Sequence, residues 1–474
     1  MNFRKISVLL LVATFAGLSC SESFLEVNPQ QSVSNEQALL TFQDYQSSIT
    51  GVYNVLSSAN YYGRYFILVP DVMSDDVKQN SQANRAKEYA EYAAFEEHFI
   101  TEGMWATIYS GIGAANAIIN APKPDIPSSL DDEYDQILGE AHALRGIMYF
   151  DLVRLYGQHY GFTAGASHLG VPIVLETDTF SEPARNTVAE VYAQVISDLT
   201  QGVSLMGNST RNSNTSTLSA WAAKAMLARV YLHQGDWVNA ESMANDVIVN
   251  GPFALVDSAG YIASWASETG YSSESIFEIA MTETDNRGSD ALGRMYIVEG
   301  YGDYLPSDDW FNLLPAGDVR EGFLLNDGGL SGVYAPYRLG KYPSTTGENN
   351  TVVLRLSEMY LIRAEAAAMQ TGKEGIAQAD ITTIRQRALP SQPAVTSTGA
   401  ALMTDIRLER RLELAFEGHR LWDLMRWQQN LVRNTCTSTV AAACNVAYPN
   451  DRFVLPIPAN EQDANPNAQP NPGY

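Results

Sequence analysis

Apolar residues recur at helical spacing along most of this chain. Between residues 138 and 155 they return every three or four positions, which places them on one face of an α-helix. Residues 187–205 repeat the pattern, and Asn186 or Thr187 is placed to cap the start of that helix. The sequence therefore predicts two long helices that pack through one apolar face each. The apolar positions of the first are Leu138, Ala141, Leu144, Ile147, Met148, Leu152 and Leu155.

Residues 219–249 predict two helices joined by a turn at Gly235 and Asp236. Small residues would let the two helices approach each other, while large residues fill the groove between them. The spacing is that of a tetratricopeptide repeat, although any helical hairpin can use the same alternation of small and large residues. A second pair is expected at residues 354–369 and 377–388, and residues 403–430 predict one further long helix. The repeat positions are Leu227, Ala228, Tyr231, Ala240 and Pro252.

Strand-like patches are short, at residues 171–175, 275–280, 351–354 and 453–457. Three long stretches rich in polar and aromatic residues interrupt the helices, at residues 76–92, 257–271 and 282–304. Loops of this length in a compact domain are usually functional or disordered. We therefore expect residues 21–474 to form a mainly α-helical domain of tetratricopeptide-type helix pairs, with minor short β-strands and long loops that face the ligand.

Composition and charge narrow the possible ligands. The chain has 474 residues, of which 45% are hydrophobic and 18% are charged, so a large core can form and wholesale disorder is excluded. The formal net charge is −24. A surface this acidic repels phosphate backbones and anionic lipid headgroups, which argues against nucleic acid as a partner. A neutral ligand meets no such penalty.

The N-terminus has the pattern of an export signal. Arg4 and Lys5 precede an apolar or small-residue run over residues 6–17, which is too short for a comfortable membrane span. Residues 1–19 are therefore predicted to be a signal peptide, with a buried N-terminal helix as the alternative. Cys20 follows directly and resembles the acylated cysteine of a bacterial lipoprotein, which implies lipidation at Cys20 and an anchor in the outer membrane.

Cys436 and Cys444 are the other two cysteines of the chain. In an exported protein they can close a small loop as a disulfide, and the alternative is two free buried thiols. Neither has a neighbouring His or Cys that would complete a zinc site. We expect no metal and no cofactor.

Several acidic residues invite a catalytic interpretation. Glu409, Glu413 and Glu417 stand at intervals of four, among Arg410, Arg411 and Arg420. The carboxylates of a glycosidase face each other across a cleft, about 5–10 Å apart. A run of Arg and aromatic residues instead favours buried ion pairs that fix helix packing. Likewise His419 is expected to be a packed histidine, and residues 285–290 a solvated turn and not a calcium loop. We expect no catalytic residues.

The C-terminal third carries a recognisable pattern. Residues 354–366 and 409–427, together with the ending Leu455-Pro456-Ile457-Pro458-x-x-Glu461, resemble the SusD/RagB family of Bacteroidetes surface lipoproteins. N-terminal segments agree, at residues 23–29, 74–76, 105–116 and 140–145. The resemblance implies a SusD-like domain over residues 20–474. Its helical-repeat part would cover about 24–255 and its RagB/SusD part about 256–474.

The same resemblance implies a function. Members of the family bind an oligosaccharide at the cell surface and pass it to a SusC-like TonB-dependent transporter in the outer membrane. Glu22 and Glu26, close behind Cys20, resemble the acidic export tag of such lipoproteins. Peptide binding, as in the RagB branch, is the alternative within the family. A secreted glycosidase is a third hypothesis from a different class.

A sugar-binding face needs exposed aromatic rings that are held rigidly outside the helix interior. The three long loops supply the candidates, although each ring could instead pack against its own loop. Trp265, in a stretch rich in Gly and Ser, is the first choice. We expect Trp265→Ala to weaken glycan binding about tenfold and to leave the melting temperature nearly unchanged. The other candidates are Tyr89, Tyr92, Tyr271, Tyr296, Tyr301 and Tyr304.

Overall fold

Helices dominate the computed structural model, which describes residues 39–176, 180–208, 210–266 and 271–474. Helix accounts for 51% of the structure and strand for 7%, so the expected mainly α-helical fold is confirmed. Within these residues, no helix combines the length and the apolar character that a membrane crossing requires. Cys20 and the predicted signal peptide lie outside the described residues.

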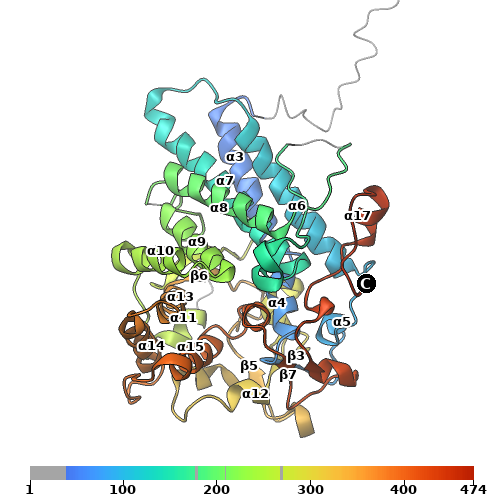
Figure 1. The fold of residues 1–474 in the computed structure, drawn as a ribbon, viewed down its shortest axis with the longest axis vertical. Coiled ribbons are helices and arrows are strands. Elements are labelled where there is room, and N and C mark those ends of the chain that lie inside the picture. Colours follow the sequence, from blue (N-terminus) through green and yellow to red (C-terminus); the bar gives the residue numbers. More distant parts are fainter. Residues whose placement is uncertain (1–38, 177–179, 209, 267–270) are drawn as a thin grey trace, which may run out of the picture.

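Four long helices pack together at the upper end of the molecule in Figure 1. Thr187 caps the last of them and forms a capping box with Glu190, as the sequence predicted. Small residues let the last two helices approach closely, since a β-carbon at Gly202 would lie only 2.9 Å from that of Ala143. The predicted helices at 138–155 and 187–205 are thus confirmed. The four are α3 (Phe42–Leu56), α6 (Phe99–Asn120), α7 (Asp131–Tyr156) and α8 (Val188–Leu205).

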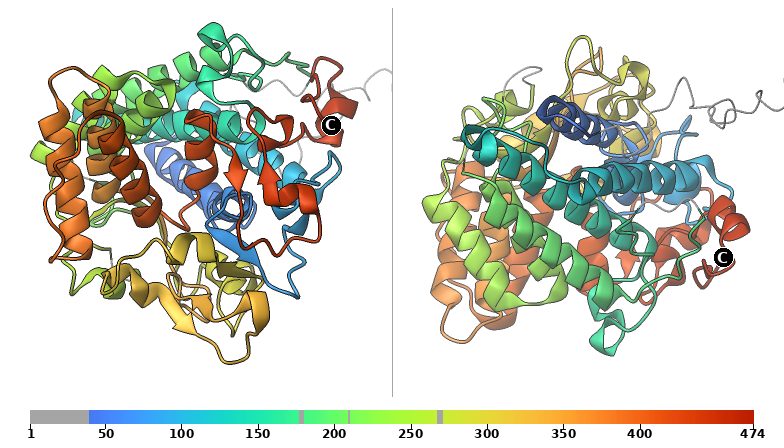
Figure 2. Two further views of the ribbon diagram at one scale, coloured as in Figure 1. Left: turned by 60° about the horizontal axis from the view of Figure 1, so that its bottom comes forward. Right: turned by 90° about the horizontal axis from the view of Figure 1, so that it is seen from above.

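Two helix pairs and a fifth helix continue the stack below. The pair α9 (Ala220–Gln234) and α10 (Trp237–Asn250) turns at Gly235, which adopts a φ of 79°. The second pair is α13 (Leu356–Ala368) and α14 (Glu374–Ala388), followed by α15 (Gly399–Glu413). Both predicted pairs are confirmed. Helix α13 packs directly against α10, so the helical layers continue across the predicted division near residue 256 (Figures 1 and 2).

The predicted long helix at residues 403–430 is wrong, because the chain breaks in its middle. Helix α15 ends at Glu413, and a short helix, α16, spans Arg420–Arg426. Between them Phe416 and Gly418 take positive φ values of 67° and 77°. The Phe416 ring packs 4.8 Å from that of Trp310, and the Gly418 N–H donates to Asp71 Oδ1 at 3.0 Å. These tertiary contacts outweigh the helical pattern.

The strands form four two-stranded antiparallel pairs. The predicted strands at 275–280 and 351–354 are confirmed, and they pair with each other. The patches at 171–175 and 453–457 are not strands. Their backbone groups bond elsewhere: Tyr149 Oη donates to the Val174 carbonyl, and the Leu455 N–H donates to the Leu155 carbonyl. The pairs are β1 (Val77–Gln79) with β3 (Tyr304–Pro306), β2 (Ser275–Ile279) with β6 (Thr351–Arg355), β4 (Leu324–Asn326) with β5 (Tyr337–Leu339), and β7 (Leu431–Val432) with β8 (Asn445–Val446).

Short helices connect these layers. Several stand at the lower and right-hand edges of the molecule in Figure 1, near β3, β5 and β7. They are α4 (Tyr65–Val72), α5 (Lys87–Ala90), α11 (Tyr261–Ala266), α12 (Asp308–Phe311) and α17 (Ala459–Ala464).

A buried ion network joins the C-terminal motif to its surroundings. Glu413 Oε1 lies 2.5 Å from Arg355 Nη1 and 2.6 Å from Arg387 Nη2. Glu417 Oε1 accepts from Lys341 Nζ and from Arg355 Nη2, both at 2.7 Å. Burial alone would raise the pKa of Glu413, but the surrounding guanidinium groups outweigh it and hold the pKa well below its usual range. The interpretation as structural ion pairs is confirmed.

A second set of ion pairs ties the N-terminal part to the same motif. Asp75 bonds Arg420 through both carboxylate oxygens, at 2.7 and 2.9 Å. Asp76 accepts from Arg411 Nε at 2.6 Å. Because Asp76 directly precedes β1, these pairs fix the position of that strand against α15 and α16.

We predict that Glu413→Gln destabilises the fold. The substitution leaves Arg355 and Arg387 buried beside a neutral amide, which costs about 3–5 kcal/mol. Because the folded pKa of Glu413 lies below the ordinary value of 4.5, its contribution is fully present above that pH and is lost as the pH falls. Denaturant unfolding between pH 3 and pH 7 measures both effects. The exposed Glu133→Gln serves as control, and an unchanged unfolding midpoint for Glu413→Gln would show that the network is dispensable.

Candidate functional site

The seven aromatic residues predicted to face the ligand differ widely in exposure. Tyr89, Tyr296 and Tyr304 are 0% exposed, so the expectation of exposed rings is wrong for these three. The hydroxyl group of each tyrosine forms a hydrogen bond within the protein. That of Tyr89 bonds Thr101, and that of Tyr296 bonds Asp71. The other four retain some exposure. Tyr92, Trp265 and Tyr271 are half-buried, and Tyr301 is exposed.

Trp265 lies within α11, contrary to the expectation that no helix contains it. Its ring meets Phe323 and Tyr342 edge to face, with centroids 6.2 and 6.0 Å away. Lys341 Nζ lies 4.1 Å from the ring centroid. The adjoining cavity measures about 30 Å³, which holds water but not a sugar ring. A ligand contact at Trp265 stays a prediction, and the packing favours a scaffold role.

Four aromatic rings are exposed by more than a third of their surface in the described part of the chain. Phe95 is 47% exposed, Phe99 62% and Tyr301 38%, and Phe180 is the fourth. Phe95 and Phe99 lie on either side of His98 at the start of α6, and Tyr301 lies near Tyr65, whose ring contacts that of Phe99. We refer to Phe95, Phe99 and Tyr301 as the aromatic strip.

At one end of the strip, His98 supports both phenylalanines. The Phe99 ring stacks on the imidazole at 4.9 Å, and the Phe95 ring meets it edge-on at 5.3 Å. His98 Nδ1 accepts from the Ile100 N–H at 3.2 Å, which caps α6. Burial lowers the pKa of His98, an effect that Glu88 partly offsets. Tyr89 packs edge-on behind the imidazole at 5.0 Å, so this predicted residue supports the strip from inside.

At the other end, Arg85 covers Tyr301. The Arg85 guanidinium carbon lies 3.2 Å from the Tyr301 ring centroid, and Arg85 Nη1 lies 3.2 Å from Asp303 Oδ2. Tyr304 Oη donates to the Arg85 carbonyl at 2.5 Å. The Gly302 carbonyl accepts from Asn80 Nδ2 and from Arg338 Nη1, at 2.9 and 2.8 Å. Residues 80–85, β3 and β5 therefore fix Tyr301 jointly.

Tyr65 connects the two ends. Its ring lies 6.2 Å from that of Phe99, and the Arg64 guanidinium lies 4.1 Å above it. Arg64 Nη1 in turn bonds Asp290 Oδ1 at 2.7 Å, and the Asp290 side chain is largely exposed. Burial raises the pKa of Tyr65, and the charges of Arg64, Asp290 and Arg85 also act on it. Arg64, Arg85 and Asp290 thus lie around one tyrosine, among the rings of the strip.

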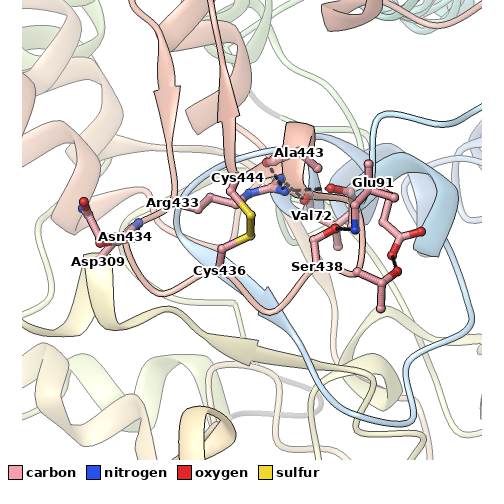
Figure 3. Close-up of a disulfide and its surroundings, with 12 residues drawn as sticks. Val72, Glu91, Asp309, Arg433, Asn434, Cys436, Ser438, Ala443 and Cys444 are labelled. Carbon is pink, nitrogen blue, oxygen red and sulfur yellow. Dashed lines mark hydrogen bonds between the residues drawn. A yellow bond between two sulfur atoms is a disulfide. The ribbon is translucent and has the colours of Figure 1, made fainter.

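A disulfide lies close to Arg433, near Val72 and Glu91 (Figure 3). Cys436 and Cys444 are bonded, with their Cα atoms 5.5 Å apart, which confirms the predicted pairing. Beside it, the buried Arg433 donates to the carbonyls of Val72 and Ala90 at 2.8 and 2.7 Å. Burial lowers the pKa of Arg433. Arg433 precedes the loop that the disulfide closes and also donates to the Ala443 carbonyl within it, at 3.0 Å, so it joins the loop to the ends of α4 and α5. Helix α5 contains Tyr89.

In the acidic turn at residues 285–290, arginine side chains form ion pairs with the carboxylates. Arg287 Nη2 bonds Asp285 Oδ1 at 2.6 Å, and Asp290 is bonded to Arg64. Over the described residues, no cluster of three or more His, Cys, Asp or Glu side chains is arranged to hold a metal ion.

The aromatic strip offers rings, hydrogen-bond donors and a carboxylate in fixed positions, which is an arrangement for binding.

Sequence analysis missed Phe95 and Phe99. A signal was present, because Phe99 is out of phase with the buried positions of α6, such as Ile100, Met104 and Ile108. Such a position places a large apolar ring on the solvent side of the helix.

Family models match two parts of the chain. Residues 331–474 match the model described as the SusD family, and residues 23–232 match one described as starch-binding associating with outer membrane.

Similar proteins cover nearly the whole chain. A SusD superfamily protein from Bacteroides thetaiotaomicron VPI-5482 is 31% identical, with a TM-score of 0.84 over 91% of this chain and 100% of its own. A laminarin binding SusD-like protein is 23% identical, with a TM-score of 0.74 over 92% of this chain and 100% of its own. The SusD-like protein P2 of Formosa agariphila is 26% identical over the full length of both chains.

We predict that Trp265→Ala acts on stability. The substitution removes the ring between Phe323, Tyr342 and Lys341, and truncating a half-buried tryptophan costs about 2–4 kcal/mol. Thermal unfolding measures the stability of the variant. Titration with a glycan that the wild-type protein binds measures its ligand affinity. A melting temperature equal to that of the wild type, together with weakened glycan binding, would reinstate Trp265 as a ligand residue.

Proposed function

This chain belongs to the SusD family, and on that premise we propose that it binds an oligosaccharide at the aromatic strip. The observation that carries the proposal is that three of the four exposed rings of the described residues gather there. One structural neighbour is named for binding laminarin, which makes a glucan the first ligand to test.

The chemistry of the strip suits a sugar chain. Aromatic rings offer flat apolar faces to the C–H faces of sugars, and a ring contact is worth about 0.5–1.5 kcal/mol beyond area burial. Arg85 and Asp290, whose side chains are partly exposed, lie among the rings and can bond hydroxyl groups. Because His98 and Arg85 already hold the rings, little ordering cost is left for binding.

The charge pattern favours a neutral glycan. Three arginines near the strip already have a carboxylate partner, since Arg64 pairs with Asp290, Arg85 with Asp303, and Arg338 with Asp327. The net charge of −24 repels polyanions, which disfavours glycans rich in sulfate or uronate groups.

Binding without catalysis is part of the proposal. The glutamates of the C-terminal motif are buried in ion pairs, and Asp290 and Asp303 are each bonded to an arginine. A glycosidase would need two carboxylates facing the substrate, about 5–10 Å apart.

Capture would be followed by delivery. We infer that Cys20 is lipidated, that the protein is anchored on the outer face of the outer membrane, and that it passes the glycan to a SusC-like TonB-dependent transporter. The signal-like N-terminus and the family model described as associating with outer membrane support this inference.

Removing a ring of the strip tests the binding site. We expect Phe99→Ala and Tyr301→Ala each to weaken glycan affinity about tenfold, with little change in melting temperature, because both rings are solvent-exposed. Isothermal titration with laminarin oligosaccharides, other neutral glucans and mixed peptides measures the affinity. Val249→Ala, an exposed change on α10, is the control.

Wild-type affinity in both ring variants would move the glycan site away from the strip. Binding of peptides without any glycan would favour the RagB-type alternative. Release of shorter sugars, followed by chromatography, would revive the glycosidase hypothesis.

Changing the proposed anchor residue tests localisation. Cys20→Ala removes the thiol that would carry the lipid, so the variant should leave the membrane fraction and become soluble. Fractionation of cells that express either form measures this directly. A variant that still partitions with membranes would place the anchor elsewhere.

A further inference from the structure

A cleft of about 390 Å³ opens between α6 and α17, apart from the residues of the aromatic strip. Figure 1 shows these two helices side by side. The volume lies within the range of about 300–1,000 Å³ that is typical of ligand sites. Its lining comes from three separate parts of the chain: α6, the segment around Pro172 and Pro183, and the C-terminal residues from Pro458 to Glu461.

Hydrogen bonds hold the walls of the cleft in place. Trp105 Nε1 donates to Glu461 Oε2 at 3.2 Å, which joins α6 to α17. Tyr109 Oη donates to the Pro172 carbonyl at 2.8 Å. Asn460 Nδ2 donates to Glu102, and Asn465 Nδ2 donates to the Pro183 carbonyl at 2.9 Å. The cleft is therefore formed before any ligand arrives.

The lining combines aromatic rings with carboxylates. The rings of Trp105 and Tyr109 lie 4.9 Å apart, and three prolines add apolar surface. The carboxylates are Glu102 and Glu461. No residue that lines the cleft is basic, and within the described parts of the chain neither carboxylate forms an ion pair. Their recorded partners are neutral N–H groups, of Trp105, Asn460 and Asn465.

We propose that this cleft binds an extended peptide segment that carries a lysine or an arginine. The cationic head would meet Glu102 and Glu461, which retain free acceptor positions. Its alkyl stem and the neighbouring backbone would pack on Trp105, Tyr109 and the prolines, where a cation also gains from the ring faces. A polyanion would be repelled, and a neutral ligand would leave both charges without a partner.

Two synthetic peptides test the charge requirement. Acetyl-Gly-Lys-Pro-Lys-Gly-amide and its glutamine counterpart, acetyl-Gly-Gln-Pro-Gln-Gly-amide, differ only in charge. Isothermal titration of the full chain at low salt should show at least about tenfold tighter binding of the lysine peptide, and the difference should shrink as salt rises. Equal affinities for the two peptides, or no binding of the lysine peptide, would overturn the proposal.

Amide variants locate the binding site. Glu102→Gln keeps the shape of the side chain and its bond to Asn460, so it should weaken the lysine peptide about five- to tenfold without lowering the melting temperature. Glu461→Gln should weaken the peptide alike, since the amide oxygen can still accept from Trp105. It gives up the bond from Asn465 Nδ2, which keeps its bond to the Pro183 carbonyl. Glu133→Gln removes an equal charge outside the cleft and should change nothing.

Phe99→Ala separates this site from the proposed glycan site. It should leave peptide affinity unchanged, and Glu102→Gln should leave glycan affinity unchanged. Wild-type peptide affinity in Glu102→Gln, or an equal loss in Glu133→Gln, would show that the peptide does not bind in this cleft.

Discussion

The structure depends on the contact between Arg355 and the two glutamates Glu413 and Glu417. Arg355 ends β6 and precedes α13, whereas Glu413 is the last residue of α15 and Glu417 lies in the break between α15 and α16. A continuous helix would carry the glutamates in fixed relation, one turn apart. Because of the break, Glu417 also bonds Lys341. The Lys341 ammonium group donates a further hydrogen bond to the Ala415 carbonyl at 2.8 Å. The Arg355 guanidinium group therefore joins three segments: the end of β6, the end of α15 and the turn that precedes α16.

A short series of contacts connects this ion network to the aromatic strip. Arg411 and Arg420 extend the charged motif to Asp76 and Asp75, directly before β1. Strand β1 pairs with β3, whose first residue, Tyr304, bonds the backbone of Arg85. Arg85 then lies over Tyr301. Buried charges are costly to desolvate and contribute little net stability, but their geometry is demanding. Here that geometry sets the position of a surface ring, and the rigidity it confers lowers the ordering cost of binding.

Local signals allowed much of the fold to be predicted. The Thr187 cap, the turn at Gly235 and the pairing of Cys436 with Cys444 depend on residues close in sequence, and each was among the outcomes that the pattern predicted. The exposure of single rings could not be predicted in this way. Tyr304 is buried because its hydroxyl bonds the carbonyl of Arg85, 219 residues away. Burial of each ring depends on distant partners that composition does not reveal.

The most direct test of the account is a crystal structure of the protein with a bound neutral oligosaccharide. The account predicts a sugar ring stacked on Phe99 or Tyr301, with a hydroxyl bonded to Arg85 or Asp290, and ion pairs of Arg355 unchanged from those described here. A saccharide bound elsewhere, with the aromatic strip unoccupied, would contradict the assignment of the strip as the ligand face.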